Sequence, residues 1–90
     1  MFIISYDIVK NKNRVKIAKI LEDYGFRVQY SVFECDLIKD ELSKVISMIN
    51  NRIDIDKDSI KIYFLCKDCQ NKILSIGKLK ERGFQKVIVI

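Results

Sequence analysis

The sequence predicts an α+β fold in which two helices cover one face of a small, mostly antiparallel sheet. Apolar residues recur at helical spacing in two stretches, residues 17–24 and 42–49. Apolar or alternating stretches of strand length precede, separate and follow these two helices. The predicted order is a strand, a helix, a strand or strand pair, a helix and a strand, which fits the βαββαβ pattern of an α+β sandwich.

The first strand is predicted over residues 2–8, because the chain opens on an apolar run. A polar, basic segment follows, in which Asn11 or Asn13 is available as the N-cap of the first helix. The apolar positions within residues 17–24 form one helical stripe, and Gly25 is a natural stop for that helix.

From residue 26 the apolar period changes to two. Apolar side chains occupy even positions as far as Val32 and odd positions from Phe33 onward. A strand cannot exchange its two faces without a bulge or a turn. We therefore expect a kinked strand, or two short strands that meet near residues 31–33.

The second helix is predicted over about residues 39–52, with Asp40 and Glu41 in its first turn, where the helix dipole favours them. A polar turn at residues 54–58 leads into an apolar strand over residues 60–64.

Residues 66–77 are predicted as a turn followed by a short helical piece around 72–76. A further turn is expected at residues 80–83, and a β-branched strand at residues 86–90 ends the chain. The apolar residues of that strand need a pairing partner, and a second copy of the chain is one candidate.

The composition predicts one domain, residues 1–90, in which residues 80–90 are a C-terminal strand extension in dimer contact. No apolar run approaches the ~18 residues of a membrane span, and the N-terminus has no signal-peptide pattern. The three cysteines are an odd number, and reduced thiols in the cytoplasm are the plain interpretation.

Basic residues are concentrated in one stretch of a chain whose net charge is +5. Residues 10–19 hold five lysines and arginines and no acid. This stretch either meets phosphates or forms a solvated helix face, and charge alone leaves both open. The chain has no histidine, which removes the commonest general base and the commonest transition-metal ligand.

Cys66 and Cys69 form a lone CxxC motif. Structural zinc needs four ligands, and the chain offers only one more cysteine, Cys35, and no histidine. Ordinary thiols are therefore favoured over a metal or redox role. The alternating aspartates of residues 54–58 lack the glycine and distal glutamate of a calcium loop, which favours turn formation.

Asp7 carries a carboxylate at the end of a buried strand, where a charge needs water, a hydrogen-bond partner or a cation. A single carboxylate is a poor Mg²⁺ site, but a two-fold axis near the strand end would bring two copies of Asp7 to one cation. The alternative is that Asp7 caps the following turn as an Asx motif.

Several stretches of the sequence resemble a known family. They are ISYDI, which includes Tyr6 and Asp7, then NRVKIAKILEDYGFRVQYSVFECDL, which begins beside Arg14, and DSIKIYFLC. Together they cover most of the chain and are similar to the small CRISPR-associated endonucleases, the smaller of the two universal spacer-acquisition proteins.

The resemblance implies a ferredoxin-like fold and a homodimer. It also implies a Mg²⁺-dependent nuclease site at the dimer interface, with Asp7 from each chain as metal ligand and catalytic residue. Tyr6 and Arg14 fall at further positions linked to activity. Arg14, Lys16 and Arg27 are the expected nucleic-acid contacts. Phe33 is linked to activity in the family, and its simpler interpretation is a dimer-core aromatic.

The substrate implied is single-stranded RNA or double-stranded DNA, and the implied partner is the larger CRISPR integrase, in a complex where the dimer bridges two integrase pairs. Two function classes stay open: a metal-dependent endonuclease and a non-catalytic dimeric DNA-binding scaffold of the integration complex. A toxin-like ribonuclease that acts alone is a weaker third.

Overall fold

The computed structural model describes residues 1–76 and 86–88. Their helices and strands, in chain order, are β1 (Phe2–Asp7), α1 (Asn11–Glu22), β2 (Gly25–Gln29), β3 (Val32–Cys35), α2 (Lys39–Asn50), β4 (Ser59–Phe64), α3 (Lys67–Gln70), β5 (Leu74–Ile76) and β6 (Lys86–Ile88). Among the helices of these described residues, none combines the length and apolar composition needed to cross a bilayer.

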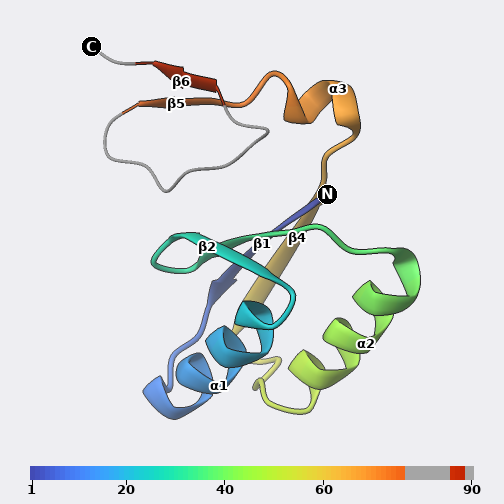
Figure 1. Cartoon of the computed structure of the whole chain (residues 1–90). Helices are drawn as coiled ribbons and strands as arrows, with labels where there is room; N and C mark the ends of the chain where they lie inside the picture. The colour runs from blue at the N-terminus through green and yellow to red at the C-terminus, as the bar shows by residue number, and fades with distance from the viewer. Residues whose placement is uncertain (77–85, 89–90) are drawn as a thin grey trace.

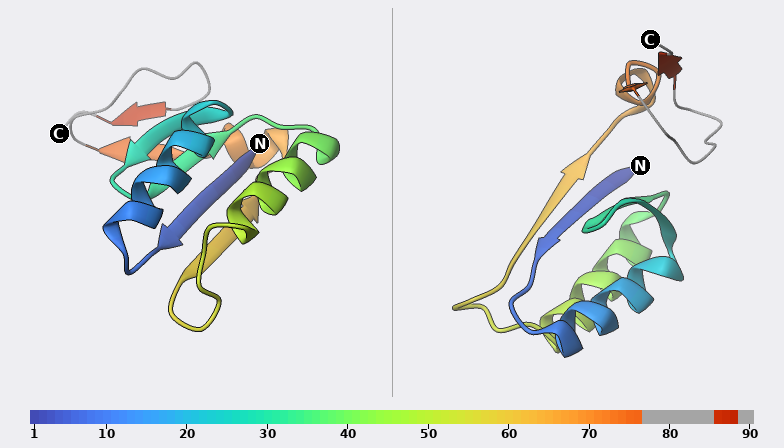
Figure 2. Two further views of the ribbon diagram at one scale, coloured as in Figure 1. Left: turned by 90° about the horizontal axis from the view of Figure 1, so that it is seen from below. Right: turned by 90° about the vertical axis from the view of Figure 1, so that its left-hand side faces the viewer.

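Four strands form one antiparallel sheet in the order β2-β3-β1-β4. Helices α1 and α2 lie against the same face of this sheet (Figures 1 and 2). No described helix covers the opposite face. The α+β class and the ferredoxin-like βαββαβ order predicted from the sequence are therefore confirmed.

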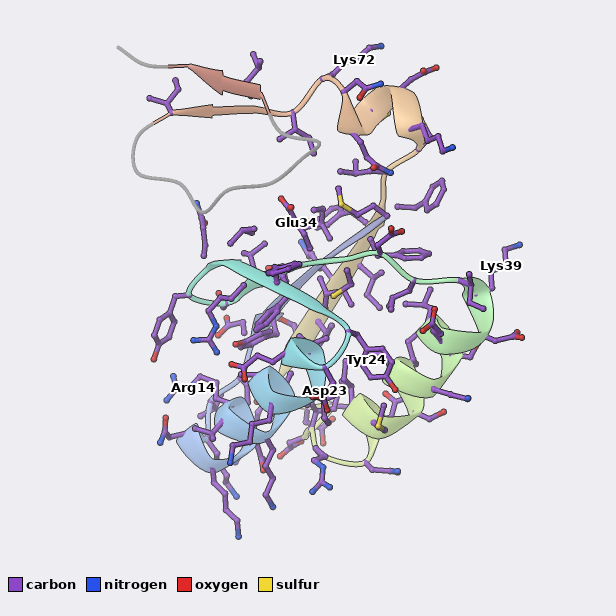
Figure 3. All side chains as sticks on the ribbon, viewed as in Figure 1. Arg14, Asp23, Tyr24, Glu34, Lys39 and Lys72 are labelled. Carbon is purple, nitrogen blue, oxygen red and sulfur yellow. The ribbon has the colours of Figure 1, made fainter. Side chains whose placement is uncertain are left out.

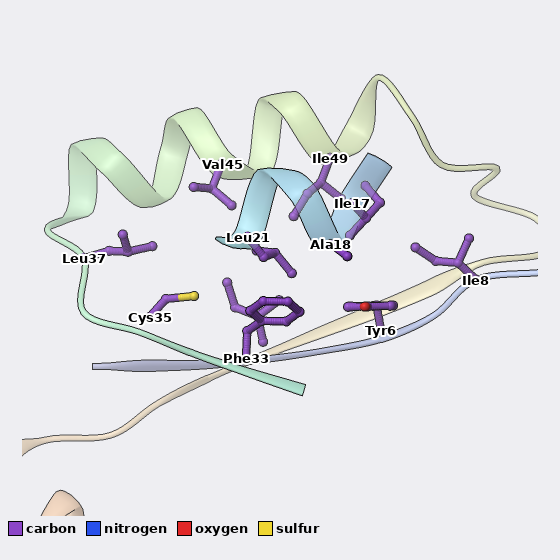
Figure 4. Close-up of a cluster of buried hydrophobic side chains, with 11 residues drawn as sticks. Tyr6, Ile8, Ile17, Ala18, Leu21, Phe33, Cys35, Leu37, Val45 and Ile49 are labelled. Carbon is purple, nitrogen blue, oxygen red and sulfur yellow. The ribbon is translucent and has the colours of Figure 1, made fainter. Parts of the chain in front are cut away.

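The core lies between the sheet and the two helices (Figure 4). Its fully buried members come from both layers: Ile4, Phe33 and Cys35 from the strands, and Ile17, Leu21 and Val45 from the helices. Burial of each large apolar side chain contributes about 1.5–3 kcal/mol. Most residues of the two helical stripes meet here with Phe33 and Cys35 of β3, whereas Phe26, one of the even-numbered apolar positions, is 63% exposed.

The change of apolar phase corresponds to two short strands. β2 and β3 are separated by a turn at Tyr30 and Ser31, and their register shifts between Arg27 and Gln29. Gly25 does not cap α1, whose C-cap is Asp23. It begins β2 instead, where a Cβ atom would collide with the backbone carbonyl of the neighbouring β3 strand.

The predicted N-cap of α1 is wrong. The helix begins at Asn11, its N-cap is Lys10, and no side chain caps it. The amide oxygen of Asn11 accepts a hydrogen bond from the guanidinium Nη2 of Arg14 at 3.3 Å instead. In α2 the carboxylate of Glu41, in the first turn, accepts a hydrogen bond from the backbone N–H of Ile38 at 3.2 Å. Such a bond satisfies a backbone donor at the start of the helix.

The segment after β4 differs from the prediction of a helix around residues 72–76. The helix is α3, and residues 74–76 form β5, which pairs in parallel with β6 of the same chain. The last strand therefore has an intrachain partner. These two strands stand beyond one end of the four-stranded sheet (Figure 2). The predicted turn at residues 80–83 and residues 89–90 lie outside the described residues.

Candidate functional site

Asp7 is the last residue of β1, and its side chain is exposed. Along β1, Ile4 and Tyr6 are buried beneath the helices, at 0% and 6% exposure. Since side chains alternate between the faces of a strand, Ile3 and Asp7 belong to the uncovered face. The strand thus delivers its carboxylate to the face that the helices leave open.

The turn after Asp7 is held by Asp58. Its carboxylate accepts the backbone N–H groups of Val9 and Asp54, each at 2.9 Å. These two hydrogen bonds hold the pKa of Asp58 below its usual value, because they favour the charged form. The Asp7 carboxylate makes no hydrogen bond or ion pair with the described residues, so the alternative that Asp7 caps this turn is wrong.

On the uncovered face Asp7 stands beside Ser59 of β4, and large apolar side chains lie toward the other end of β1. Ile3 stands opposite Tyr63 of β4 and opposite Glu34 of β3, which itself pairs with Phe26 of β2. Phe26 and Tyr63 are 63% and 50% exposed. An uncovered sheet face with large exposed aromatic side chains is typical of an interaction surface.

A second polar feature lies at the edge where α1 meets β2. A cavity of about 100 Å³ is lined by Tyr6, Asn11, Arg14, Val15, Ala18, Arg27 and Tyr30. We call this cavity the arginine pocket. Figure 3 shows Arg14 extending from α1 on the side of the molecule where β2 lies. Tyr6, Arg14 and Arg27 thus come together here from three different elements.

The guanidinium groups give the arginine pocket a positive character. Arg27 lies with its Cζ 5.3 Å from the ring centre of Phe33, and its Nη2 is 3.6 Å from a carboxylate oxygen of Glu22. Within the described residues, the guanidinium of Arg14 donates only to the uncharged amide of Asn11. The Nε atoms of both arginines are buried and make no hydrogen bond with the described residues. Two such donors favour an anion.

Tyr6 supports this pocket from the core side. Its hydroxyl donates to the backbone carbonyl of Tyr30 at 3.4 Å, and its ring stacks on Phe33 with centroids 6.2 Å apart (Figure 4). Burial raises the pKa of the Tyr6 hydroxyl, against the smaller opposing effect of the Arg27 charge. The hydroxyl is therefore protonated at neutral pH, and Tyr6 belongs to the opposite face of the sheet from Asp7.

The remaining predicted residues occupy different places. Phe33 is fully buried in the protomer core, so it does not stand on an exposed surface as a dimer-core aromatic would. Lys16 is half-buried on α1 and does not line the arginine pocket. The sequence reasoning did not single out Asn11 or Tyr30 as pocket residues. In the sequence, Asn11 was recognisable only as a candidate N-cap of the first helix. Tyr30 showed no feature that predicts a pocket residue beyond its place in the turn.

The side chains of a single chain limit which metal sites are possible. Among the described residues, no group of three or more histidine, cysteine or acidic side chains is placed to hold a metal ion. Mg²⁺ binds through one or two carboxylates and keeps several waters or phosphate oxygens. The exposed, unpaired Asp7 fits that pattern as one ligand of a site completed from outside the chain.

Comparison with known proteins gives a consistent result. The family model of CRISPR associated protein Cas2 matches residues 1–73. The chain is 46% identical over 77 residues to the CRISPR-associated endoribonuclease Cas2 1 of Chloroflexus aurantiacus, covering 84% of this chain and 83% of that protein. It is 40% identical over 86 residues to the CRISPR-associated endoribonuclease Cas2 2 of Methanospirillum hungatei, covering 96% of both.

Solved structures show the same likeness. The crystal structure of Streptococcus pyogenes Cas2 superposes with a TM-score of 0.77 at 33% identity, covering 84% of this chain and 98% of that one. A hypothetical protein from Thermus thermophilus superposes with a TM-score of 0.71 at 37% identity, covering 72% and 79% of the two chains. With a matching fold, a matching family model and relatives of this identity, the chain belongs to the CRISPR-associated Cas2 family.

Proposed function

We propose that this chain is a Mg²⁺-dependent endonuclease that cleaves phosphodiester bonds in single-stranded RNA or double-stranded DNA. The observation that carries the proposal is the unpaired, exposed carboxylate of Asp7 at the end of β1. The names of its relatives support the reaction class, since they are called endoribonucleases in Chloroflexus aurantiacus and Methanospirillum hungatei and an endonuclease in Thermus thermophilus.

The active form is a homodimer in which the uncovered sheet faces meet. Ile3, Phe26 and Tyr63 supply apolar surface on the same face as Asp7, toward the other end of β1, and pairing of two such faces removes that surface from water. A two-fold axis near the end of β1 places the two Asp7 carboxylates together. Two negative charges at one point repel each other, and a shared divalent cation offsets that repulsion.

Asp7 of each chain would hold Mg²⁺. When bound, the ion would polarise the phosphoryl oxygen and lower the pKa of a water that attacks the phosphorus. The chain has no histidine to act as a base, which favours metal-activated water as the nucleophile. Arg14 and Arg27 bind phosphate groups of the nucleic acid, with Lys16 as a further cation on α1. Tyr6 positions Arg27 through Phe33 and does not touch the reacting atoms.

The protein acts in CRISPR spacer acquisition together with the larger CRISPR integrase, in the cytoplasm, and residues 1–90 form its single domain. A second function has a specific observation in its favour. Asp7 and the arginine pocket lie on different faces of the sheet, so the pocket can hold nucleic acid without Asp7. That arrangement suits a non-catalytic dimeric DNA-binding scaffold of the integration complex.

A nuclease assay separates the two functions. Purified protein is incubated with single-stranded RNA and with duplex DNA, with Mg²⁺ or with EDTA, and compared with the Asp7→Ala variant. Cleavage that requires both Mg²⁺ and Asp7 supports the endonuclease. Metal-dependent cleavage that is unchanged in Asp7→Ala overturns the assignment of Asp7. Binding without cleavage of either substrate favours the scaffold.

A further inference from the structure

Cys66 and Cys69 lie together on an exposed turn that the proposed function does not use. Cys66 is the N-cap of α3, and its sulfur accepts the backbone N–H of Cys69 at 3.4 Å. The two Sγ atoms are 3.3 Å apart. Both side chains are exposed, whereas the third cysteine, Cys35, is fully buried.

We propose that Cys66 and Cys69 form a reversible intrachain disulfide by exchange with a low-molecular-weight disulfide such as oxidised glutathione. The sulfur atoms must approach from 3.3 Å to about 2.0 Å, which side-chain rotation at an exposed turn provides. The backbone of α3 already holds the two residues in the required proximity, through the contact of the Cys69 N–H with the Cys66 sulfur.

The two thiols have different roles in the exchange. The backbone N–H of Cys69, which donates to the Cys66 sulfur, lowers the pKa of Cys66 because it favours the thiolate, and the contact between the two sulfur atoms acts in the same direction. Hydrogen bonding to Cys66, with its adjacent negative charge, raises the pKa of Cys69. Cys66 is therefore the attacking thiol and Cys69 the resolving thiol.

The reaction balances in two steps. The Cys66 thiolate attacks one sulfur of oxidised glutathione, forms a mixed disulfide and releases one glutathione thiolate. The Cys69 thiol then loses its proton to solvent and attacks the Cys66 sulfur, forming the Cys66–Cys69 bond and releasing the second glutathione. Two protein thiols are oxidised, and one glutathione disulfide is reduced to two thiols.

A metal site at these thiols is less well supported than a disulfide. Structural zinc takes four protein ligands. In the part of the chain that the structure describes, the two thiols have no third histidine, cysteine or acidic side chain grouped with them as a ligand. Two thiols without further ligands are sufficient for a disulfide.

The turn also has a structural position that a disulfide would affect. The backbone of Leu65 is hydrogen-bonded to Met1 at the start of β1, with its N–H donating to the Met1 carbonyl at 2.8 Å. The side-chain amide of Gln70 in α3 donates to the Leu65 carbonyl at 3.2 Å. A Cys66–Cys69 bond fixes this turn and so the direction in which the chain leaves the sheet toward β5.

The test uses the reduced full-length protein, incubated with oxidised glutathione, quenched with an alkylating agent and measured by intact mass and peptide mapping. The expected product has lost the mass of two hydrogen atoms, contains the Cys66–Cys69 bond and retains Cys35 as an alkylated thiol. Dithiothreitol should restore all three thiols. A product with no loss of thiols, a stable glutathione adduct or a bond between two chains would overturn the proposal.

Two variants test the roles of the thiols. Cys69→Ser should stop at the mixed disulfide and accumulate glutathione on Cys66, whereas Cys66→Ser should react several-fold more slowly. The reverse order would contradict the assignment of Cys66 as the attacking thiol. Amide hydrogen exchange adds an independent readout, because the N–H groups of Asn71 and Lys72 bond back to Lys67 and Cys69. Their exchange should slow in the oxidised protein and return to its original rate on reduction.

Discussion

The guanidinium of Arg27 lies 5.3 Å from the ring centre of Phe33, and the ring of Tyr6 stacks on the same Phe33 ring, with the two centroids 6.2 Å apart. This contact joins the arginine pocket to the hydrophobic core. A cation over an aromatic face contributes about 0.5–1 kcal/mol at partly exposed sites. Phe33 therefore has two effects, one on the stability of the fold and one on the position of Arg27.

Replacement of Phe33 by alanine should destabilise the protein by about 3–5 kcal/mol, because it removes a fully buried ring and leaves a cavity. The free energy of unfolding in urea measures this loss. The control is Ile55→Ala, at a side chain that is 80% exposed, which should change stability by less than about 0.5 kcal/mol. Similar losses for both variants would contradict the core assignment of Phe33.

The arginine pocket should contribute to phosphate binding. Arg14→Ala should weaken binding to nucleic acids of any sequence and lower the salt dependence of affinity by about one phosphate contact. Fluorescence anisotropy between about 50 and 200 mM salt measures the slope. Lys44→Ala, on the exposed side of α2, is the matched control and should leave the slope unchanged. An unchanged slope in Arg14→Ala would assign the basic stretch to a solvated helix face.

Asp58 should make stability depend on pH in the acid range. Its folded pKa is lowered by hydrogen bonds from the N–H groups of Asp54 and Val9, whereas in the unfolded chain it is about 3.9. The contribution of the charged form is therefore fully present above about pH 4 to 5 and is lost as the pH falls through the folded pKa.

The measurement compares urea unfolding of the parent protein and Asp58→Asn at neutral pH and near pH 3. The variant should be less stable at neutral pH, and the difference should shrink in acid. Asp56→Asn is the control, because its carboxylate accepts no hydrogen bond in the described residues. A difference between parent and Asp58→Asn that is constant with pH would show that the charge of Asp58 is unimportant.

Periodicity predicted most of the fold because it reports which side chains are buried. The change of phase between Val32 and Phe33 indicated a break between two strands, and the turn lies just before it, at Tyr30 and Ser31. Capping was not predictable in the same way. Asn11 has the right chemistry for an N-cap, but Arg14, three residues later, binds its side chain.

The site was predicted in part for a similar reason. The position of Asp7 at the end of a strand was readable from local sequence. Asp7 is separated from the arginine pocket because side chains alternate along the strand and the helices cover only one face of the sheet. Which face the helices cover depends on the whole fold and not on the local sequence. Tyr30 lines the pocket because of the turn between β2 and β3, and no short-range sequence pattern specifies the geometry of that turn.

The C-terminal strand provides a test of dimer contact. β6 pairs with β5 in the same chain, and a two-stranded ribbon retains free edges that can add to the sheet of a partner. Deletion of residues 86–90 should therefore raise the dimer dissociation constant, measured by analytical ultracentrifugation. An unchanged dimer would show that this strand serves only its own chain.

Asp7→Asn should separate catalysis from binding. The substitution keeps the size of the side chain and removes the charge that would hold Mg²⁺, so metal-dependent cleavage should be lost. The arginine pocket lies on the other face of the sheet, and the apolar surface toward the other end of β1 is unchanged, so nucleic-acid affinity and the dimer should persist. Without metal, the dimer should be at least as stable as the parent, since the repulsion between two facing carboxylates is gone.

The control for this variant is Asp36→Asn, an exposed carboxylate that follows β3 at the end of the sheet where β1 begins. It carries the same change of charge far from the end of β1 and should cleave like the parent. Cleavage assays, anisotropy and sedimentation on the same preparations measure the three properties together. Full cleavage by Asp7→Asn would contradict its catalytic role, whereas loss of the folded dimer would make Asp7 a structural residue, because a ligand of an added metal is not needed for folding.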